Sequence, residues 1–201
     1  MFIKNISFEK KFFKVTFDND EYVKVSEDTL VRYNLYKGLE VSEDFPEILE
    51  YEDEKTRALN ISYKFLERLK TKKQLVDHLY KNKIKPQIID EVIETCREKK
   101  YLNDLDYGLR YLNDAQNIKK YGKIKTIYML KSKGIESQDI DEIMKSYNYD
   151  LEYENAKELL YKKIDASDFN IKKLNSAKKY LMGRGFEYDI ISSVTGDLSE
   201  S

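Results

Sequence analysis

The chain has little of the chemistry from which most enzyme sites are built. Among its 201 residues are one cysteine and one histidine, so an internal disulfide is impossible and no His/Cys spacing for a zinc ion exists. Neither a phosphate-binding glycine loop nor a dinucleotide-binding glycine pattern occurs. Carboxylates are many, but they fall on predicted helix faces and caps, where solvation is their usual role. We therefore expect no enzyme, no cofactor and no metal, and look for a binding function.

The single cysteine and the single histidine both have structural interpretations. Cys96 follows Ile89, Val92 and Ile93 at helical spacing, which predicts a buried thiol rather than a reactive one. His78 lies in a lysine-rich helical pattern, which predicts a solvated or rim histidine rather than a catalytic base.

Long apolar runs are also absent. No stretch of about 18 apolar residues exists to span a membrane. The first residues lack the apolar core of a signal peptide. Together with the single cysteine, these absences predict a cytoplasmic protein.

What the chain has in abundance is charge, in 36% of its residues, with only two prolines. This composition is typical of long solvated helices. The charge is unevenly distributed, because residues 1–54 hold 7 basic and 14 acidic residues whereas residues 55–100 hold 13 basic and 6 acidic ones. The net charge of −1 conceals this asymmetry, which predicts different surroundings for the two segments.

A helix–turn–helix pattern recurs with a period of 51 residues. Leu79, Leu130 and Leu181 share one position in it, and Gly134 and Gly185 lie in the turn that follows. The other matched positions are Ile84, Ile135 and Phe186; Ile89, Ile140 and Ile191; and Val92, Ile143 and Val194. A fixed period with matched apolar positions predicts stacked repeats. We expect three tandem three-helix repeats, at 55–102, 103–150 and 151–201, in an elongated curved array.

The first 54 residues predict a different structure. Phe13, Val15 and Phe17 recur at every second residue, which is the period of a half-buried strand. A cluster at residues 18–20 predicts a turn into another strand, and the run from residue 2 to residue 8 could add a third. Ser26 is placed to cap a helix. The chain is thus predicted to be mainly α, with a small α+β N-terminal module (residues 1–54) that contains a short antiparallel sheet.

Basic residues concentrate in the second helix of each predicted repeat, and helices at matched positions would align them as one basic stripe. Such a stripe could follow a nucleic-acid backbone or an acidic protein surface, and the alternative is a solvated lysine face. Tyr80, Tyr121 and Tyr128 lie nearby and could stack on bases, although packing in the core or at its rim is the commoner role. The residues predicted to bind are Lys70, Lys72, Lys73, Lys81, Lys83, Lys119, Lys120, Lys123, Lys125, Lys131, Lys133, Lys172, Lys173 and Arg184.

The order of the motifs resembles the RecX family of RecA regulators. The resemblance covers essentially the whole chain, and its front segment is similar to the extra N-terminal module of longer RecX proteins of Gram-positive bacteria. Two positions depart from the family: Asn103, where an acidic residue is common, and Gly108, where alanine is usual. The residues that carry the resemblance are Tyr101, Leu102, Asn103, Asp104 and Tyr107; Tyr121, Gly122, Lys123, Ile127 and Leu130; Lys133, Gly134 and Ile135; and residues 185–190.

The resemblance implies a protein that binds the RecA nucleoprotein filament and lowers its ATP hydrolysis and strand exchange. We expect a monomer that does not bind membranes, and weak binding of single- or double-stranded DNA stays open. Two other interpretations of the residues also stay open: a helical-repeat protein that binds nucleic acid directly, and a scaffold for another protein. The acidic N-terminal module could pack against the basic first repeat or reach a second protein.

Overall fold

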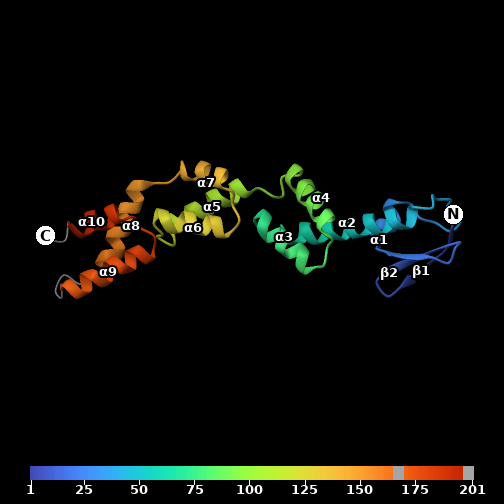
Figure 1. The fold of residues 1–201 in the computed structure, drawn as a ribbon, viewed down its shortest axis with the longest axis horizontal. Helices are drawn as coiled ribbons and strands as arrows, with labels where there is room; N and C mark the ends of the chain where they lie inside the picture. Colours follow the sequence, from blue (N-terminus) through green and yellow to red (C-terminus); the bar gives the residue numbers. More distant parts are fainter. Residues whose placement is uncertain (165–169, 197–201) are drawn as a thin grey trace. The chain divides into compact units, whose positions relative to one another are not determined.

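The computed structural model describes residues 1–164 and 170–196 (Figure 1). Over these residues the fold is mainly helical, with ten helices and one three-stranded sheet, as the sequence predicts. The chain divides into two compact units. The first unit is Met1–Leu69 with Leu75–Leu102, and the second is Lys70–Gln74 with the described residues from Asn103 onward.

The sheet of the first unit confirms the predicted antiparallel strands. Its order is β1 (Ile3–Glu9), β2 (Phe12–Phe17) and β3 (Tyr22–Val25), with both neighbouring pairs antiparallel. The predicted turn contains Asp20, whose φ of 65° is tolerated by this short polar side chain. Alternation along β2 and β3 buries one face of the sheet against α1 (Glu27–Arg32) and the start of α2 (Phe45–Phe65).

Two consecutive carboxylates of α2 connect the sheet-containing part of the first unit to its later helices. Asp53 Oδ1 accepts hydrogen bonds from Ser26 N, Ser26 Oγ and Thr29 Oγ1 at 2.7, 2.8 and 2.7 Å, so it fixes the start of α1. Glu54 Oε1 accepts a bond of 2.9 Å from Lys85 N, at the start of α4 (Pro86–Glu98). Residue 54, where the sequence places the end of the N-terminal module, therefore lies inside α2, and the predicted domain boundaries stay predictions.

In the helical part of the first unit, α2, α4 and α3 (Lys72–Lys81) enclose an apolar core. Only the residues of α3 from Leu75 onward belong to this unit. Cys96 is fully buried there, and this burial raises the pKa of its thiol. The ring of His78 stacks on Phe65 with 4.1 Å between ring centroids. The side chains of Cys96 and His78 therefore both pack against other residues of the first unit.

The second unit contains six further helices, and asparagine side chains cap three of them. Asn103, Asn148 and Asn170 accept bonds of 3.0, 2.9 and 3.0 Å from backbone N–H groups three residues on. Gly108 leaves room for Ile143, because a Cβ at residue 108 would lie 2.1 Å from Ile143 Cδ1. The helices are α5 (Asp104–Asn117), α6 (Lys123–Ser132), α7 (Ser137–Met144), α8 (Tyr149–Tyr161), α9 (Ile171–Gly183) and α10 (Tyr188–Gly196).

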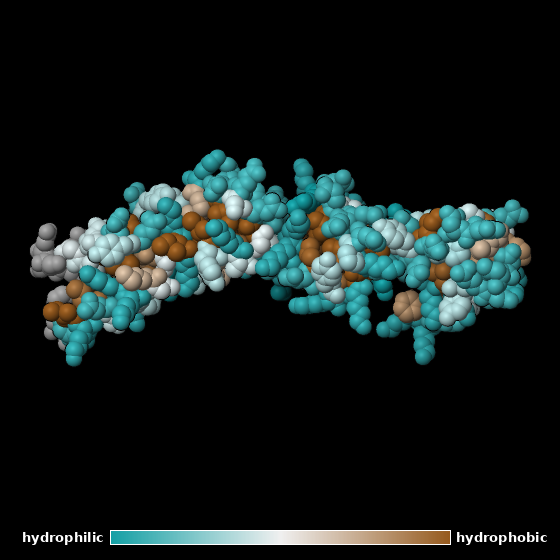
Figure 2. Space-filling view, viewed as in Figure 1, coloured by the Kyte–Doolittle hydropathy of each residue, from teal (hydrophilic) through white to brown (hydrophobic). Residues whose placement is uncertain are grey.

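The 51-residue pattern identifies positions that are buried wherever they recur. All twelve matched apolar residues are buried, and Leu79, Leu130 and Leu181 are completely inaccessible. The turns that follow them share a left-handed residue, Lys83, Gly134 or Gly185, with φ of 60°, 83° and 85°. Hydrophilic side chains cover much of the face seen in Figure 2, and apolar side chains show through between them. None of the helices in the described residues is long and apolar enough to cross a membrane.

Candidate partner-binding surface

Several lysines of the predicted stripe make contacts inside the second unit. Lys72 N donates to Asp104 Oδ1 at 2.8 Å, and Lys72 Nζ lies 4.0 Å from Glu136 Oε1. Lys73 Nζ donates to Ser132 O, at the end of α6, at 3.2 Å. The segment Lys70–Gln74 is thereby attached to the turn that follows α6.

Contacts of the same kind hold the start of α6, with Lys123 at the position matched to Lys72 and Lys125 one residue beyond the position matched to Lys73. Lys123 N donates to Glu152 Oε1 at 2.9 Å, and Lys123 Nζ lies 3.6 Å from Glu187 Oε1. Lys125 Nζ donates to Gly183 O, at the end of α9, at 3.1 Å. We call these two sets of contacts the repeat seams, and they give the lysines of both seams a structural role.

The glycine turns allow the seams to close. A Cβ added at Gly134 would lie 2.5 Å from Lys73 Cβ, and one at Gly185 would lie 2.3 Å from both Lys125 Cβ and Lys125 N. Lys83 occupies the matched left-handed position with an exposed side chain. Because a lysine adopts the matched left-handed conformation, close packing is the main reason for glycine at these two turns, and the positive φ favours it further.

Glu152 supports the second seam from inside. It is 1% exposed, and burial raises the pKa of its carboxyl. The buried Tyr147 lies beside it, and burial followed by the charge of Glu152 raises the pKa of the Tyr147 hydroxyl. The start of α6 is thus held by a buried carboxyl group.

A second group of cations lies over tyrosine rings of the second unit. Lys119 Nζ is 4.4 Å from the ring centroid of Tyr111, and Lys133 Nζ is 5.5 Å from the same ring. Arg184 lies 5.1 Å from the Tyr121 ring and donates from Nε to Lys120 O at 3.2 Å. We define the tyrosine–cation surface as these groups together with their neighbours: Lys119, Lys125, Lys133, Lys163 and Arg184 over Tyr107, Tyr111, Tyr121 and Tyr180.

This surface retains its positive charge. Among the residues that the structure describes, none of its five cations forms an ion pair with a carboxylate. Tyr111 is 7% exposed, and burial raises the pKa of its hydroxyl, with smaller contributions from Tyr121, Tyr107 and Asp114. A ring buried like that of Tyr111 is a poor platform for a base, whereas the cations remain available to phosphate or carboxylate groups.

The predicted stripe therefore separates into classes. Lys72, Lys120 and Lys123 pair with glutamates, and Lys73, Lys125 and Arg184 donate to backbone carbonyls. Lys119 and Lys133 lie over tyrosines, and Lys70 and Lys173 each have an interaction within the chain. Four exposed lysines make no such contact with a described residue: Lys81, Lys83, Lys131 and Lys172. The sequence missed Lys163, because it follows a first helix rather than lying in a second one.

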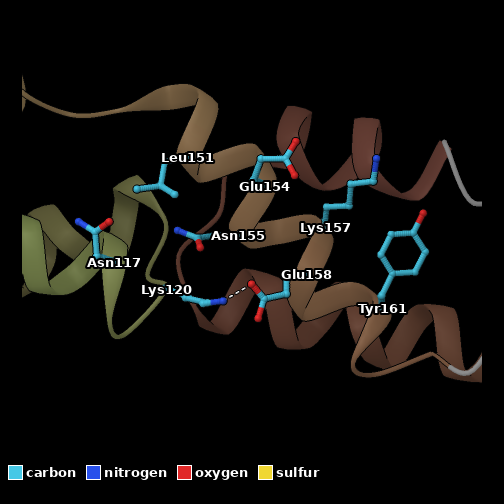
Figure 3. A pocket seen from close by; sticks show the side chains of 8 residues that line it. All are labelled: Asn117, Lys120, Leu151, Glu154, Asn155, Lys157, Glu158 and Tyr161. Atoms are coloured by element: carbon cyan, nitrogen blue, oxygen red, sulfur yellow. Dashed lines mark hydrogen bonds and ion pairs between the residues drawn. The ribbon is translucent and has the colours of Figure 1, made fainter.

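A hollow of about 500 Å³ lies between the end of α5 and one face of α8 (Figure 3). Lys120 points across it and pairs with Glu158, and Lys120 and Lys162 together lower the pKa of the Glu158 carboxyl to about 2. Glu154 and Lys157 add one charge of each sign to its lining. The hollow thus favours neither anions nor cations, and the described residues contain no cluster of His, Cys, Asp or Glu placed to hold a metal ion.

Comparison with known proteins places the chain in one family, although no family model matches it. The regulatory protein RecX of Bacillus subtilis is 31% identical over 96% of this chain and 75% of its own length. The regulatory protein RecX of Leuconostoc mesenteroides is 27% identical over 96% of this chain and 74% of its own length. A crystal structure of regulatory protein RecX superposes with a TM-score of 0.76 over 97% of this chain and 98% of its own, at 20% identity. The crystal structure of RecX from Lactobacillus salivarius superposes with a TM-score of 0.68 over 75% of this chain and 99% of its own, at 25% identity. On this similarity in sequence and fold, the chain belongs to the RecX family of regulatory proteins.

Proposed function

We propose that this chain is a non-enzymatic regulator that binds the RecA nucleoprotein filament and lowers its ATP hydrolysis and strand exchange. Its membership of the RecX family, along 96% of the chain, is the observation that carries the proposal. RecX-like proteins act on RecA, and the resemblance extends over both units of this chain.

The tyrosine–cation surface is the part of the second unit best suited to this role. Its five cations are held in place by ring and carbonyl contacts, and so they lose little side-chain freedom when a partner binds. An acidic surface of the filament would supply the carboxylates that these cations lack. Several such weak contacts along a filament would add up through multivalency without a deep pocket.

The first experiment is to titrate this protein into the DNA-dependent ATP hydrolysis of RecA. We expect inhibition at protein concentrations well below that of RecA, because one bound molecule would contact several subunits. Unchanged hydrolysis, with the protein shown to be folded by circular dichroism, would contradict the proposal.

The contribution of the surface is tested by neutralising Lys119 and Lys133 together with glutamine. Both side chains lie over Tyr111. Lys133 takes part in the first seam only through its backbone carbonyl, which accepts from Thr71 Oγ1 at 2.8 Å, so replacing the side chains should leave the seams intact. Lys145→Gln is the matched control, because Lys145 is exposed and pairs with Glu142 at the end of α7. Weaker filament binding with a smaller salt dependence is expected for the double variant but not for the control.

Direct nucleic-acid binding is the second candidate, and the same unpaired cations favour it. A nucleic-acid backbone would release counterions on binding them, which gives affinity a steep dependence on salt. Gel-shift titration of bare single-stranded DNA at increasing salt separates the two candidates. Tight, salt-sensitive binding without RecA, together with unchanged RecA activity, would favour the second candidate over the first.

A further inference from the structure

Two large side chains with apolar surface are exposed on the outward side of α6. Ile124 is 55% exposed and Tyr128 is 67% exposed, one helical turn apart on the same side of the helix. The inward side is apolar too, with Leu130 completely buried and Ile127 and Met129 partly buried. Between its lysines, α6 thus carries apolar side chains on two sides, and those on the outward side are uncovered in the second unit.

The 51-residue pattern provides an internal comparison for this ridge. The residues matched to Ile124 and Tyr128 are Lys73 and Asp77 in α3. In α9 they are Asn175 and Lys179, which are both exposed. Packing of the second helix in this fold therefore does not require apolar residues at these two positions, and their presence in α6 points to contact with something else.

We propose that the outward ridge of α6, formed by Ile124 and Tyr128, docks into an apolar pocket with acidic groups at its rim on the protein partner. This inference rests on the proposed function, in which that partner is the RecA filament. Tyrosine is enriched among the residues that dominate binding energies, because it buries a large rigid ring and keeps a polar tip. A single isoleucine beside it fits a small apolar pocket.

The charges next to the ridge identify the rim of that pocket. Lys131 follows Tyr128 by three residues on the same side and is exposed, and its side chain forms no hydrogen bond, ion pair or ring contact with a described residue. Lys125 lies at the other end of the helix, where its Nζ donates to Gly183 O in the second seam and is 4.7 Å from the Tyr121 ring. It has no carboxylate partner in the part of the chain that the structure describes, so its positive charge is not neutralised. Apolar groups flanked by such cations match an apolar pocket bordered by carboxylates.

The test places the two residues found at the matched positions of α9 into α6. The double variant Ile124→Asn and Tyr128→Lys carries side chains that the fold already accepts at matched positions, so it should fold normally. Tyr188→Lys is the matched control, because Tyr188 is 70% exposed at the start of α10. Binding to RecA filaments on single-stranded DNA is measured by co-sedimentation, and stability by thermal unfolding.

We expect the double variant to bind filaments at least about tenfold more weakly, at unchanged thermal stability, and the control to bind within about twofold of the original chain. Equal filament binding by the original chain and the double variant would overturn the docking role of the ridge while leaving the proposed function in place. Absence of filament binding by the original chain would overturn both. If the double variant lost only binding to bare DNA, the occupant of the ridge would be nucleic acid rather than a protein. If the original chain were a dimer and the double variant a monomer, the occupant would be a second copy of the chain.

Discussion

Gly185 is the position at which one methyl group tests the second repeat seam most directly. Its φ of +85° is a conformation that costs an L-residue about 1–2 kcal/mol. In addition, a Cβ at Gly185 would lie 2.3 Å from Lys125 N, a backbone atom that no side-chain rotation can move away. Gly185→Ala therefore combines a conformational cost with displacement of the first turn of α6.

Two other glycines separate these contributions. Gly38 has a φ of +92° with no atom within 4 Å of an added Cβ. Gly38→Ala should therefore lower the free energy of unfolding only by the conformational cost, about 1–2 kcal/mol. Gly183 has open space and no left-handed φ, so Gly183→Ala at the end of α9 should be neutral or stabilising by up to about 1 kcal/mol. Overpacking adds about 1–3 kcal/mol, which gives about 2–5 kcal/mol for Gly185→Ala.

The assay is urea-induced unfolding followed by circular dichroism, with the free energy of unfolding compared across the three variants. The expected order of destabilisation is Gly185→Ala, then Gly38→Ala, then Gly183→Ala. If Gly185→Ala were no more destabilising than Gly38→Ala, the close packing of the seam on a bare glycine would be refuted.

Three further predictions concern other parts of the chain. Because Cys96 is fully buried and its thiol pKa is raised, it should resist a thiol reagent in the native protein and react with one equivalent in urea. Asp53→Ala removes the acceptor of three hydrogen bonds at the start of α1 and should lower the free energy of unfolding by about 2–4 kcal/mol, measured in urea, whereas Asp53→Asn should lower it less. The folded-state pKa of Glu158, about 2, lies below its ordinary 4.5, so its contribution to stability is present above pH 4.5 and is lost as the pH falls toward 2. Glu158→Gln should lack this part of the acid sensitivity when melting temperatures are compared from pH 7 to pH 2.5, and identical pH profiles would contradict the assignment.

Much of the fold was predictable because it depends on local rules. Alternation at Val15 and Phe17 predicts a half-buried strand in whatever sheet forms. The recurrence of Leu79, Leu130 and Leu181 predicts buried helical positions, because apolar side chains at a fixed period need a continuous core. All five residues are completely buried.

The functional surface was less predictable, and its lysines show why. Helical periodicity places Lys73 and Lys119 on faces of helices or near their ends, but it does not say which groups oppose them. The acceptor of Lys73 lies 59 residues away in the sequence, at Ser132 O. Lys119 instead lies over Tyr111, with no carboxylate pair among the described residues. Identical residue types thus have different roles that depend on the segment packed against them.

The sequence alone therefore determined the mainly helical fold, the N-terminal sheet, the 51-residue period and the family, because each follows from neighbouring residues or from their order along the chain. Only the tertiary structure decided which cations are neutralised, which hold the repeat seams and which remain over tyrosine rings. It also showed that Ile124 and Tyr128 point outward. The physical reason is that charge pairing and exposure depend on distances between segments far apart in the sequence, and no local pattern encodes those distances.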